Sequence, residues 1–315
     1  MKYYFCTLFD INFLHRGLAM YNSCIKHGGD GFTMWILCLD EASKKILDGL
    51  NLHNAVILTV SDLNNKELEA TKSGRSNSEF AWTCKHSLIR YAISKIPEGE
   101  IINYIDADLF LFAHPQSVYE ELGENSILIT PHRFEEEEKA REKKVGSFNA
   151  GMIFMRKDDI SRRCLSRWTK QCLDWCFAKY EETRYGDQKY LDEWPTLYPK
   201  VVVSKNKGLN IGTWNIQKYS VTKQDGQIFI DDKILTWYHF HGFRAYLNRK
   251  GKLCAYPASM TNDIIYKPYV EALNESVSQI RKSFPEFRPA TNAHPGYLRL
   301  GKQIVVQYLH KIKRT

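Results

Sequence analysis

Short apolar runs alternate with amphipathic segments over the first 130 residues of the chain. The apolar runs predict four buried strands, at 2–9, 32–39, 55–60 and 100–105. Between them, apolar positions recur at helical spacing at 14–24 and 79–96, and Pro97 and Gly99 end the second of these helices. Strands that alternate with helices indicate βαβ units and a mainly parallel sheet.

Ligands of such sheets gather beyond the carboxyl ends of the strands, where Asp10, Asp40 and Asp106 lie. After residue 145 the pattern is less regular. It predicts strands at 147–155 and 234–243, a helix rich in Trp and Cys at 159–180, and a hairpin at 224–230.

The charged run EEEEKAREKK at 135–144 has two interpretations. It is either an exposed helix with Glu135–Lys139 and Glu137–Arg141 pairs, or a mobile lid over a site, because it separates two strands that carry motifs.

The composition is that of a globular chain, since 43% of its 315 residues are hydrophobic and 25% are charged. No apolar run reaches the roughly 18 residues of a membrane span, and Asp10 interrupts the N-terminal run before it reaches signal-peptide length. The eight cysteines form no CxxC pair, as is typical of reduced thiols in a cytoplasmic protein. The net charge of +8 allows an anionic partner, but no nucleic-acid-binding motif accompanies it, so we expect no nucleic-acid partner.

The segment IINYIDADLFLF at 101–112 carries two aspartates at the end of an apolar strand. Residues two apart on a strand face the same side, so Asp106 and Asp108 are expected together, with Ala107 opposite. A divalent cation relieves the repulsion between such carboxylates, and oxygen ligands suit Mg²⁺ or Mn²⁺, which bridge to a diphosphate. The alternative is a pair of strand-end caps on a solvated turn. The place at the end of a strand in a parallel sheet favours the metal.

Two later segments add polar groups. Asn149, Ala150 and Gly151 interrupt a strand-like run, where glycine lets a ligand approach the backbone and the asparagine amide can bond sugar hydroxyls. A simple β-bulge is the alternative. In YGDQKYLDEW, Asp187 and Gln188 open a short helix, and taken alone Asp187 is better explained as an N-cap.

A pair of histidines follows in TWYHFHGF, where His239 and His241 lie two apart on a predicted strand and face the same way. Imidazole is a common metal ligand. A histidine pair between aromatic residues more often belongs to a core, but the two aspartates make metal binding the favoured interpretation.

In this order the segments resemble the metal-dependent nucleotide-sugar glycosyltransferases with the GT-A fold, especially the glycogenin and bacterial lipopolysaccharide galactosyltransferase type. That family has a DxD segment, an FNAG-type segment, a helix opened by Asp-Gln and an HxxG metal ligand. The matching residues are Asp106-Ala107-Asp108, Phe148-Asn149-Ala150-Gly151, Asp187-Gln188 and His239-Phe240-His241-Gly242. The resemblance spans residues 1–245.

The resemblance implies an α/β GT-A fold, with a mainly parallel central sheet flanked by helices. The catalytic domain would cover 1–245, with a nucleotide-binding half at 1–112 and a half for the donor sugar and the acceptor at 113–245. Residues 246–315 would form a C-terminal helical extension.

It also implies roles for individual residues. Asp106, Asp108 and His239 would hold Mn²⁺ or Mg²⁺, with His241 as the alternative to His239. The catalytic residues would be Gln188, near the anomeric carbon, and Asp187. Donor contacts would come from Thr7, Asp10, Asn12, Lys85, Asp106, Ala107, Asn149, Ala150, Gly151, Gly242 and Arg244.

The chain departs from the family after the HxxG segment. The family has a phosphate-binding Lys and then Pro-Trp, whereas here Phe243-Arg244-Ala245-Tyr246 follows. We therefore expect Arg244 or Lys85 to supply the cation for the phosphates.

The predicted function is transfer of a sugar from an NDP-sugar, with UDP favoured, to a hydroxyl of a glycan or lipid-linked acceptor. The resemblance implies retention of configuration and a place in cell-surface polysaccharide or lipopolysaccharide assembly. An inverting route, with Asp187 as general base, stays open. The other classes considered are a sugar-nucleotide pyrophosphorylase and a non-enzymatic anion- or membrane-binding protein.

The last twenty residues, 296–315, carry five basic and no acidic side chains, with apolar residues at helical spacing. They form either an ordinary docked helix or an interfacial helix on an anionic membrane surface. The second interpretation would place a cytoplasmic enzyme on the inner face of the membrane.

Overall fold

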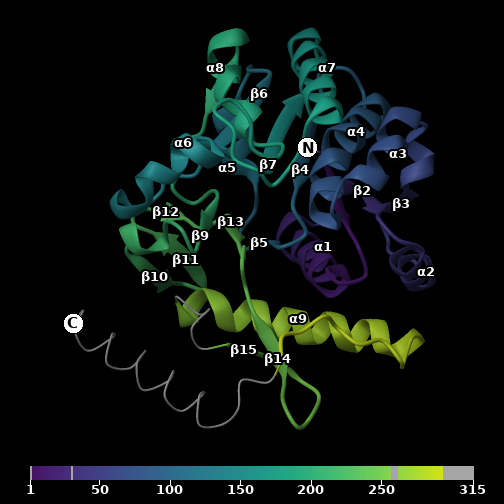
Figure 1. Ribbon diagram of the computed structural model, residues 1–315. Coiled ribbons are helices and arrows are strands. Elements are labelled where there is room, and N and C mark those ends of the chain that lie inside the picture. The colour runs from purple at the N-terminus through teal and green to yellow at the C-terminus, as the bar shows by residue number, and fades with distance from the viewer. Residues whose placement is uncertain (1, 30, 257–261, 294–315) are drawn as a thin grey trace.

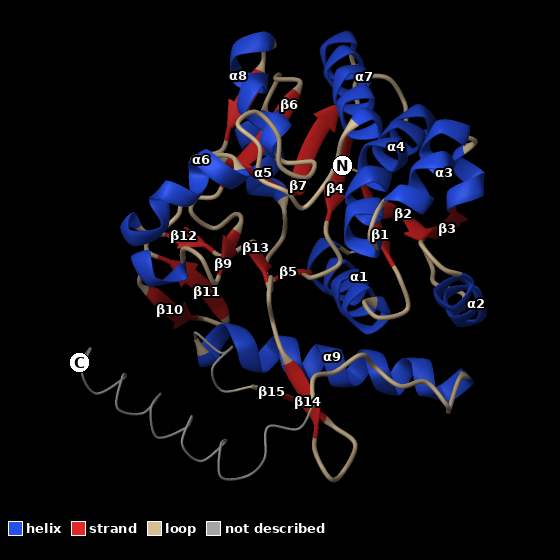
Figure 2. Ribbon diagram, in the orientation of Figure 1, coloured by secondary structure: helices blue, strands red, loops and turns tan. Residues whose placement is uncertain are grey.

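The computed structural model describes residues 2–29, 31–256 and 262–293. Its centre is a seven-stranded sheet in the order β3-β2-β1-β4-β7-β6-β8, with helices on both faces (Figures 1 and 2). The strands are β1 Tyr3–Phe9, β2 Phe32–Cys38, β3 Ala55–Thr59, β4 Ile101–Ile105, β6 Ile127–Pro131, β7 Phe148–Arg156 and β8 Val201–Val203. The predicted α/β fold with a mainly parallel sheet is confirmed.

Strands β3, β2, β1 and β4 pair in parallel, as the alternation of strands and helices predicts. Side chains of β1 alternate between the two faces. Phe5 and Phe9 join one core, and Cys6 and Leu8 join the other. The connecting helices are α1 Leu14–Gly28, α2 Glu41–Leu50, α3 Lys66–Thr71 and α4 Asn77–Lys95. The sheet is therefore buried on both faces and its carboxyl edge is left open for a site.

The other half of the sheet is mixed, because β7 runs antiparallel to both β4 and β6. Helix α7, at Asp159–Asp174, covers this half and is shorter than predicted. The shorter elements are α5 Gln116–Leu122, α6 Glu142–Val145 and α8 Trp194–Leu197. The predicted hairpin is present as β10 Val221–Gln224 and β11 Gln227–Ile230, which continue into β12 Lys233–Ile234.

The segment with the two aspartates is not one strand. The chain leaves the central sheet after β4 and turns, with the Leu109 amide bonding the Asp106 carbonyl at 3.0 Å. It then enters a second sheet, β5-β13-β9. The strands of that sheet are β5 Leu109–Leu111, β9 Ile211–Gly212 and β13 Trp237–His239. Asp106 and Asp108 therefore lie on a turn between two sheets.

The charged run forms a 3₁₀ helix, Glu136–Arg141, followed by α6. The expected i,i+4 pairs are not the ones observed. Glu138 instead pairs with Arg141 at 2.8 Å, since a three-residue turn brings i and i+3 together.

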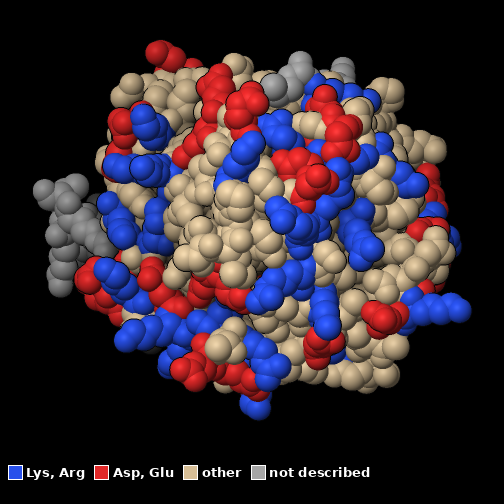
Figure 3. Space-filling view, turned by 90° about the horizontal axis from the view of Figure 1, so that it is seen from above, with Lys and Arg blue, Asp and Glu red and all other residues tan. Residues whose placement is uncertain are grey.

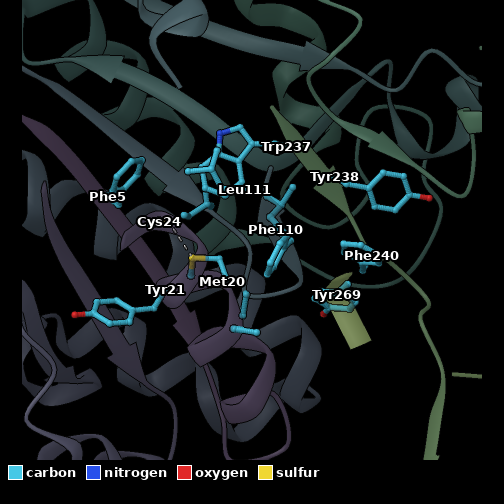
Figure 4. Packing of buried hydrophobic residues seen from close by; sticks show 14 of the residues in the cluster. Phe5, Met20, Tyr21, Cys24, Phe110, Leu111, Trp237, Tyr238, Phe240 and Tyr269 are labelled. Atoms are coloured by element: carbon cyan, nitrogen blue, oxygen red, sulfur yellow. Dashed lines mark hydrogen bonds between the residues drawn. The ribbon is translucent and has the colours of Figure 1, made fainter. Parts of the chain in front are cut away.

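The C-terminal part adds a small ribbon and a long helix. The ribbon pairs β14 Ala245–Leu247 with β15 Leu253–Ala255, and the helix is α9 Asp263–Ser283. Helix α9 packs beside α1 and shares its core (Figure 1). Tyr269 of α9 stacks on Phe240, with ring centroids 3.6 Å apart, and lies close to Phe110 (Figure 4). The helical character of the C-terminal extension is thus confirmed.

All eight cysteines are free thiols. No helix in the described part of the chain is both long and apolar enough to cross a membrane. Basic and acidic side chains are interspersed on the face seen in Figure 3. The basic segment 296–315 lies outside the described residues, so its two interpretations stay predictions.

Candidate active site

A cavity of about 270 Å³ opens at the carboxyl edge of the central sheet. Its lining includes the rings of Trp82, Phe134, Tyr185 and Trp214. Polar groups face it from the predicted segments: Lys85, Asp106, Asn149, Asp187, Gln188, His239 and His241. Aromatic faces with a few convergent polar groups are typical of a ligand site.

Asp108, His239 and His241 form a cluster whose ligand atoms all lie within 4.8 Å of one another. The antiparallel pairing of β5 and β13 sets His239 opposite Leu109, which brings Asp108 beside it. The His239 Nε2 to Asp108 Oδ1 distance is 3.0 Å. One carboxylate and two imidazoles are a donor set that fits a divalent transition metal, and His239 Nδ1 is buried without a partner among the described residues.

Electrostatics keep this carboxylate charged. Burial alone would raise the pKa of Asp108, but His239, His241 and Arg16 outweigh it and hold the pKa well below its usual value. Burial likewise opposes the charge on His239, while Asp108 raises the pKa of that imidazole. The charged carboxylate can bind a cation, and a cation that binds His239 as well displaces the proton from that ring, because only a neutral imidazole is a ligand.

Asp106 has a different set of neighbours. The Tyr104 hydroxyl donates to Asp106 Oδ1 at 2.7 Å, and the Lys85 ammonium lies 3.4 Å from the same oxygen. Asp106 therefore does not share the cluster of Asp108, although both follow the same strand. Its predicted part in metal binding stays a prediction.

Lys85 is only 3% exposed and links several of the predicted segments. Its Nζ lies 2.7 Å from Asp187 Oδ2 and donates to the Ala150 carbonyl at 2.9 Å. Burial alone would lower the pKa of Lys85, but the carboxylates of Asp106 and Asp187 raise it above its usual value. Lys85 is thus a charged centre that fixes both carboxylates.

Asp187 does not cap the helical turn Lys189–Glu193, because its side chain is directed to Lys85. It is 4% exposed, and burial raises its pKa despite the neighbouring ammonium. Gln188 lines the cavity and donates through Nε2 to the Val145 carbonyl at 2.9 Å. The two predicted catalytic residues therefore sit side by side on the cavity wall.

The Asn149-Ala150-Gly151 step coincides with an irregularity in the pairing of β6 and β7, as the bulge interpretation predicts. Asn149 Oδ1 accepts from the Gly151 amide at 2.8 Å. A Cβ at Gly151 would lie 2.6 Å from both Asn149 Oδ1 and His239 Cε1, and 2.9 Å from Asp106 Oδ2. Only glycine lets these three groups converge.

The turn after β1 lies outside the cavity. Thr7 is fully buried, and Asp10 accepts from the amide and the side chain of Asn12, both at 3.0 Å. Asp40 at the end of β2 accepts from the Ile11 amide at 2.7 Å. The turn is thus held in shape by carboxylates, at the strand ends where a nucleotide would be expected.

Comparison with known proteins supports the architecture. Two uncharacterized proteins of Bacillus subtilis (strain 168) are similar over 290 residues: YfnD at 28% identity and YfnF at 29%. Each alignment covers 90% of this chain, with 93% of YfnD and 95% of YfnF. No family model matches.

Among solved structures, the galactosyltransferase LgtC in complex with donor and acceptor sugar analogs superposes with a TM-score of 0.56. It is 16% identical and covers 86% of this chain and 95% of LgtC. An active-site mutant of LgtC gives a TM-score of 0.53 at 15% identity, covering 87% of this chain and 95% of that one. The chain has the GT-A fold. WbbM, a bifunctional glycosyltransferase, gives a TM-score of 0.52 at 15% identity, and the alignment covers 90% of this chain and 51% of WbbM.

Three of the predicted donor contacts remain to be placed. Gly242 and Arg244 come from the HxxG segment and the residues after it, and Ala107 comes from the DxD segment. Gly242 has a positive φ of 70° directly after the two histidines, a backbone conformation that favours glycine. Arg244 is exposed, and Ala107 is buried. Neither Gly242, Arg244 nor Ala107 lines the described cavity.

His132 is a site residue that the sequence did not point to. It is 4% exposed, and its Nε2 lies 3.3 Å from Asn149 Nδ2, while its Nδ1 lies 3.1 Å from the Gly146 carbonyl. Burial lowers the pKa of His132 to about 3, so the ring is neutral. A neutral ring that donates from Nδ1 accepts at Nε2, which orients the Asn149 amide. Lone histidines carry no sequence signal for such a role.

Glu138 and Arg141 of the charged run also line the cavity. The Arg141 guanidinium lies 5.1 Å from the centroid of the Phe134 ring. The run therefore borders the site, which agrees with the position expected of a lid, and its movement stays a prediction.

Proposed function

We propose that this chain is a metal-dependent glycosyltransferase that moves a sugar from an NDP-sugar, with UDP favoured, to a hydroxyl of a glycan or lipid-linked acceptor. The observation that carries the proposal is the joint placement of two sets of residues at one cavity. One set is the cluster of Asp108, His239 and His241, of which the two histidines line the cavity, and the other is Lys85 with Asp106 and Asp187.

The comparisons support the substrate class. LgtC is a galactosyltransferase whose structure holds donor and acceptor sugar analogs, and it shares the fold and most of its length with this chain. The aromatic rings of the cavity give flat apolar faces against which sugar rings pack. The carboxylates and amides around them can bond sugar hydroxyls.

The metal site follows from the donor set. Asp108, His239 and His241 would hold the cation, with Asp106 as the further ligand implied by the DxD pattern. Two imidazoles in the set favour Mn²⁺ over Mg²⁺, which prefers oxygen ligands. A divalent cation bound there would neutralise charge on the diphosphate.

The chain's own residues then position the reactants. Asn149, oriented by His132, and Asp187, fixed by Lys85, would bond hydroxyls of the transferred sugar. Gln188 would lie near the anomeric carbon. The bond between that carbon and the diphosphate breaks with its electron pair on the phosphate oxygen. The oxygen of the acceptor hydroxyl forms the new bond and its proton passes to the departing diphosphate, and we propose that this occurs with retention of configuration.

The cellular role is proposed on the same basis. An acceptor carried on a lipid or a growing glycan would place the enzyme in cell-surface polysaccharide or lipopolysaccharide assembly. The basic segment 296–315 would then hold it on the inner face of the membrane.

A screen of NDP-sugars for slow hydrolysis, with Mn²⁺, with Mg²⁺ and with a chelator, tests the proposal without knowledge of the acceptor. We expect one UDP-sugar to be cleaved in Mn²⁺, less so in Mg²⁺ and not with the chelator. Absence of both cleavage and metal-dependent UDP binding across the panel would refute the proposal. NMR of the anomeric product would then decide between retention and inversion.

A further inference from the structure

Arg16 lies in the first turn of α1, directly after the turn that follows β1. Its guanidinium lies 4.9 Å from the ring centroid of Phe13, which belongs to that turn. It also lies 5.7 Å from the ring centroid of Phe243, and Nη2 donates to the Phe243 carbonyl at 3.0 Å. One side chain thus contacts both the turn after β1 and the loop after the two histidines.

A short series of backbone bonds connects Arg16 to the metal cluster. The Phe240 amide bonds the Asp108 carbonyl at 2.8 Å, and the Phe243 amide bonds the Phe240 carbonyl at 3.0 Å. The Phe243 carbonyl then accepts from Arg16.

The guanidinium has further N–H groups that can donate hydrogen bonds to a ligand in this position. Its Nε is buried and has no hydrogen-bond partner among the described residues, and no carboxylate of the described part of the chain forms a salt bridge with it. Guanidinium presents five N–H donors in a planar fork that matches phosphate oxygens. Nη2 donates to the Phe243 carbonyl, so a phosphate would bond the remaining N–H groups of the fork.

Lys85 and Arg244, the two side chains expected to supply a cation for the phosphates, have different surroundings. Lys85 already has its ammonium between Asp106 and Asp187. Arg244 is exposed, two residues beyond the glycine that ends the histidine segment. Arg16 contacts both of the segments that a sugar nucleotide would span, from the base at the turn after β1 to the diphosphate at the histidines.

We propose that Arg16 binds the diphosphate of the sugar nucleotide, between the nucleoside and the metal cluster. This inference rests on the proposed function. Arg16 would stabilise the negative charge that grows on the diphosphate as the sugar departs.

Calorimetric binding of UDP, UMP and uridine in Mn²⁺ tests the assignment, because the three ligands differ only in phosphate. We expect Arg16→Ala to weaken UDP binding by about tenfold or more, with uridine changed less than about twofold. Arg16→Lys should restore part of the UDP affinity. Arg90→Ala, on the exposed side of α4, serves as the matched control and should bind UDP as the wild type does.

The outcomes separate the two proposals. If the wild type shows no Mn²⁺-dependent UDP binding, the proposed function fails. If the wild type binds UDP and Arg16→Ala binds it equally well, the assignment of Arg16 is wrong. Equal losses for uridine and UDP would show a purely structural role and would also overturn it.

Should Arg16→Ala not fold, Arg16→Gln answers the same question. It retains an amide that can donate to the Phe243 carbonyl but removes the charge. A loss of UDP affinity with uridine affinity preserved is expected of it, and unchanged UDP affinity would contradict the assignment.

Discussion

Asp108 and His239 are far apart in the sequence, and the antiparallel register of β5 and β13 brings them together. Their residue types and spacing pointed to a metal site before their contact was known. The HxxG spacing favoured His239, with His241 as the alternative, and the structure places both beside Asp108. The spacing of the two aspartates did not show that Asp106 faces Lys85, because the turn at residues 106–108 breaks the strand alternation on which the prediction relied.

Asp108→Asn is expected to abolish most metal-dependent UDP binding, because it removes the charge from the cluster while keeping its size. Even the loss of groups that only orient metal ligands weakens binding 10- to 100-fold, so loss of this carboxylate should weaken it by at least about 100-fold. Titration of Mn²⁺ with and without UDP measures it. Asp225→Asn, on the exposed hairpin turn, should bind as wild type, and a normal Mn²⁺ titration for Asp108→Asn would contradict the metal site.

His132→Leu is expected to slow sugar transfer more than it weakens UDP binding, because His132 orients Asn149, which we propose bonds the transferred sugar. Loss of one such hydrogen bond should lower turnover about three- to tenfold. UDP calorimetry and NDP-sugar hydrolysis, measured together, separate the two effects. His132→Gln, which retains an acceptor, should recover part of the rate; equal loss of UDP affinity would argue against the positioning role.

At the scale of elements, the strongly periodic segments were predictable. Strands β1 to β4 and helix α4 appear close to their expected bounds, because buried strands and long amphipathic helices leave clear patterns. The change from β4 to β5 was not predictable. Both flanks of the two aspartates are apolar, so nothing in the pattern shows that they enter different sheets. The ion pairs within the charged run were predicted wrongly for another reason, because its charges allow i,i+3 and i,i+4 pairs alike.

Helix α4 carries Trp82 and Lys85 into the cavity and begins with a capping box. The Ser76 hydroxyl accepts from the Glu79 amide, and the Glu79 carboxylate accepts from the Ser76 amide at 2.8 Å. Ser76→Ala should therefore lower the free energy of unfolding by about 1 kcal/mol. Urea denaturation measures this, with Ser78→Ala on the same exposed turn as the control. An equal effect of both substitutions would show that the cap contributes nothing specific.

At the scale of the whole molecule, several titratable side chains are enclosed by the two cores. His15 in α1 and His86 in α4 are buried, and burial lowers the pKa of each to about 3. Both are therefore neutral in the folded chain at pH 7. In the unfolded chain they would bind protons at their ordinary pKa near 6.5.

The free energy of unfolding should consequently fall as the pH is lowered from about 6.5 toward 3. In this window the unfolded chain binds protons that the folded chain cannot, at a cost of up to about 1.4 kcal/mol per pH unit for each histidine. Denaturant unfolding at several pH values measures the slope. His86→Leu should reduce it and His53→Gln, at an exposed position, should not; the same slope in His86→Leu would refute the assignment.

The sequence alone determined the class of fold and the residue types of the site. Periodicity is a local property, and it placed Asp106 and Asp108 directly after a strand of a parallel sheet, at the edge where ligands of such sheets bind. Only the tertiary structure decided how these residues are partnered. The contacts of Lys85 with Asp187, of His132 with Asn149 and of Arg16 with Phe243 join segments distant in the chain, and strand register and side-chain packing set them.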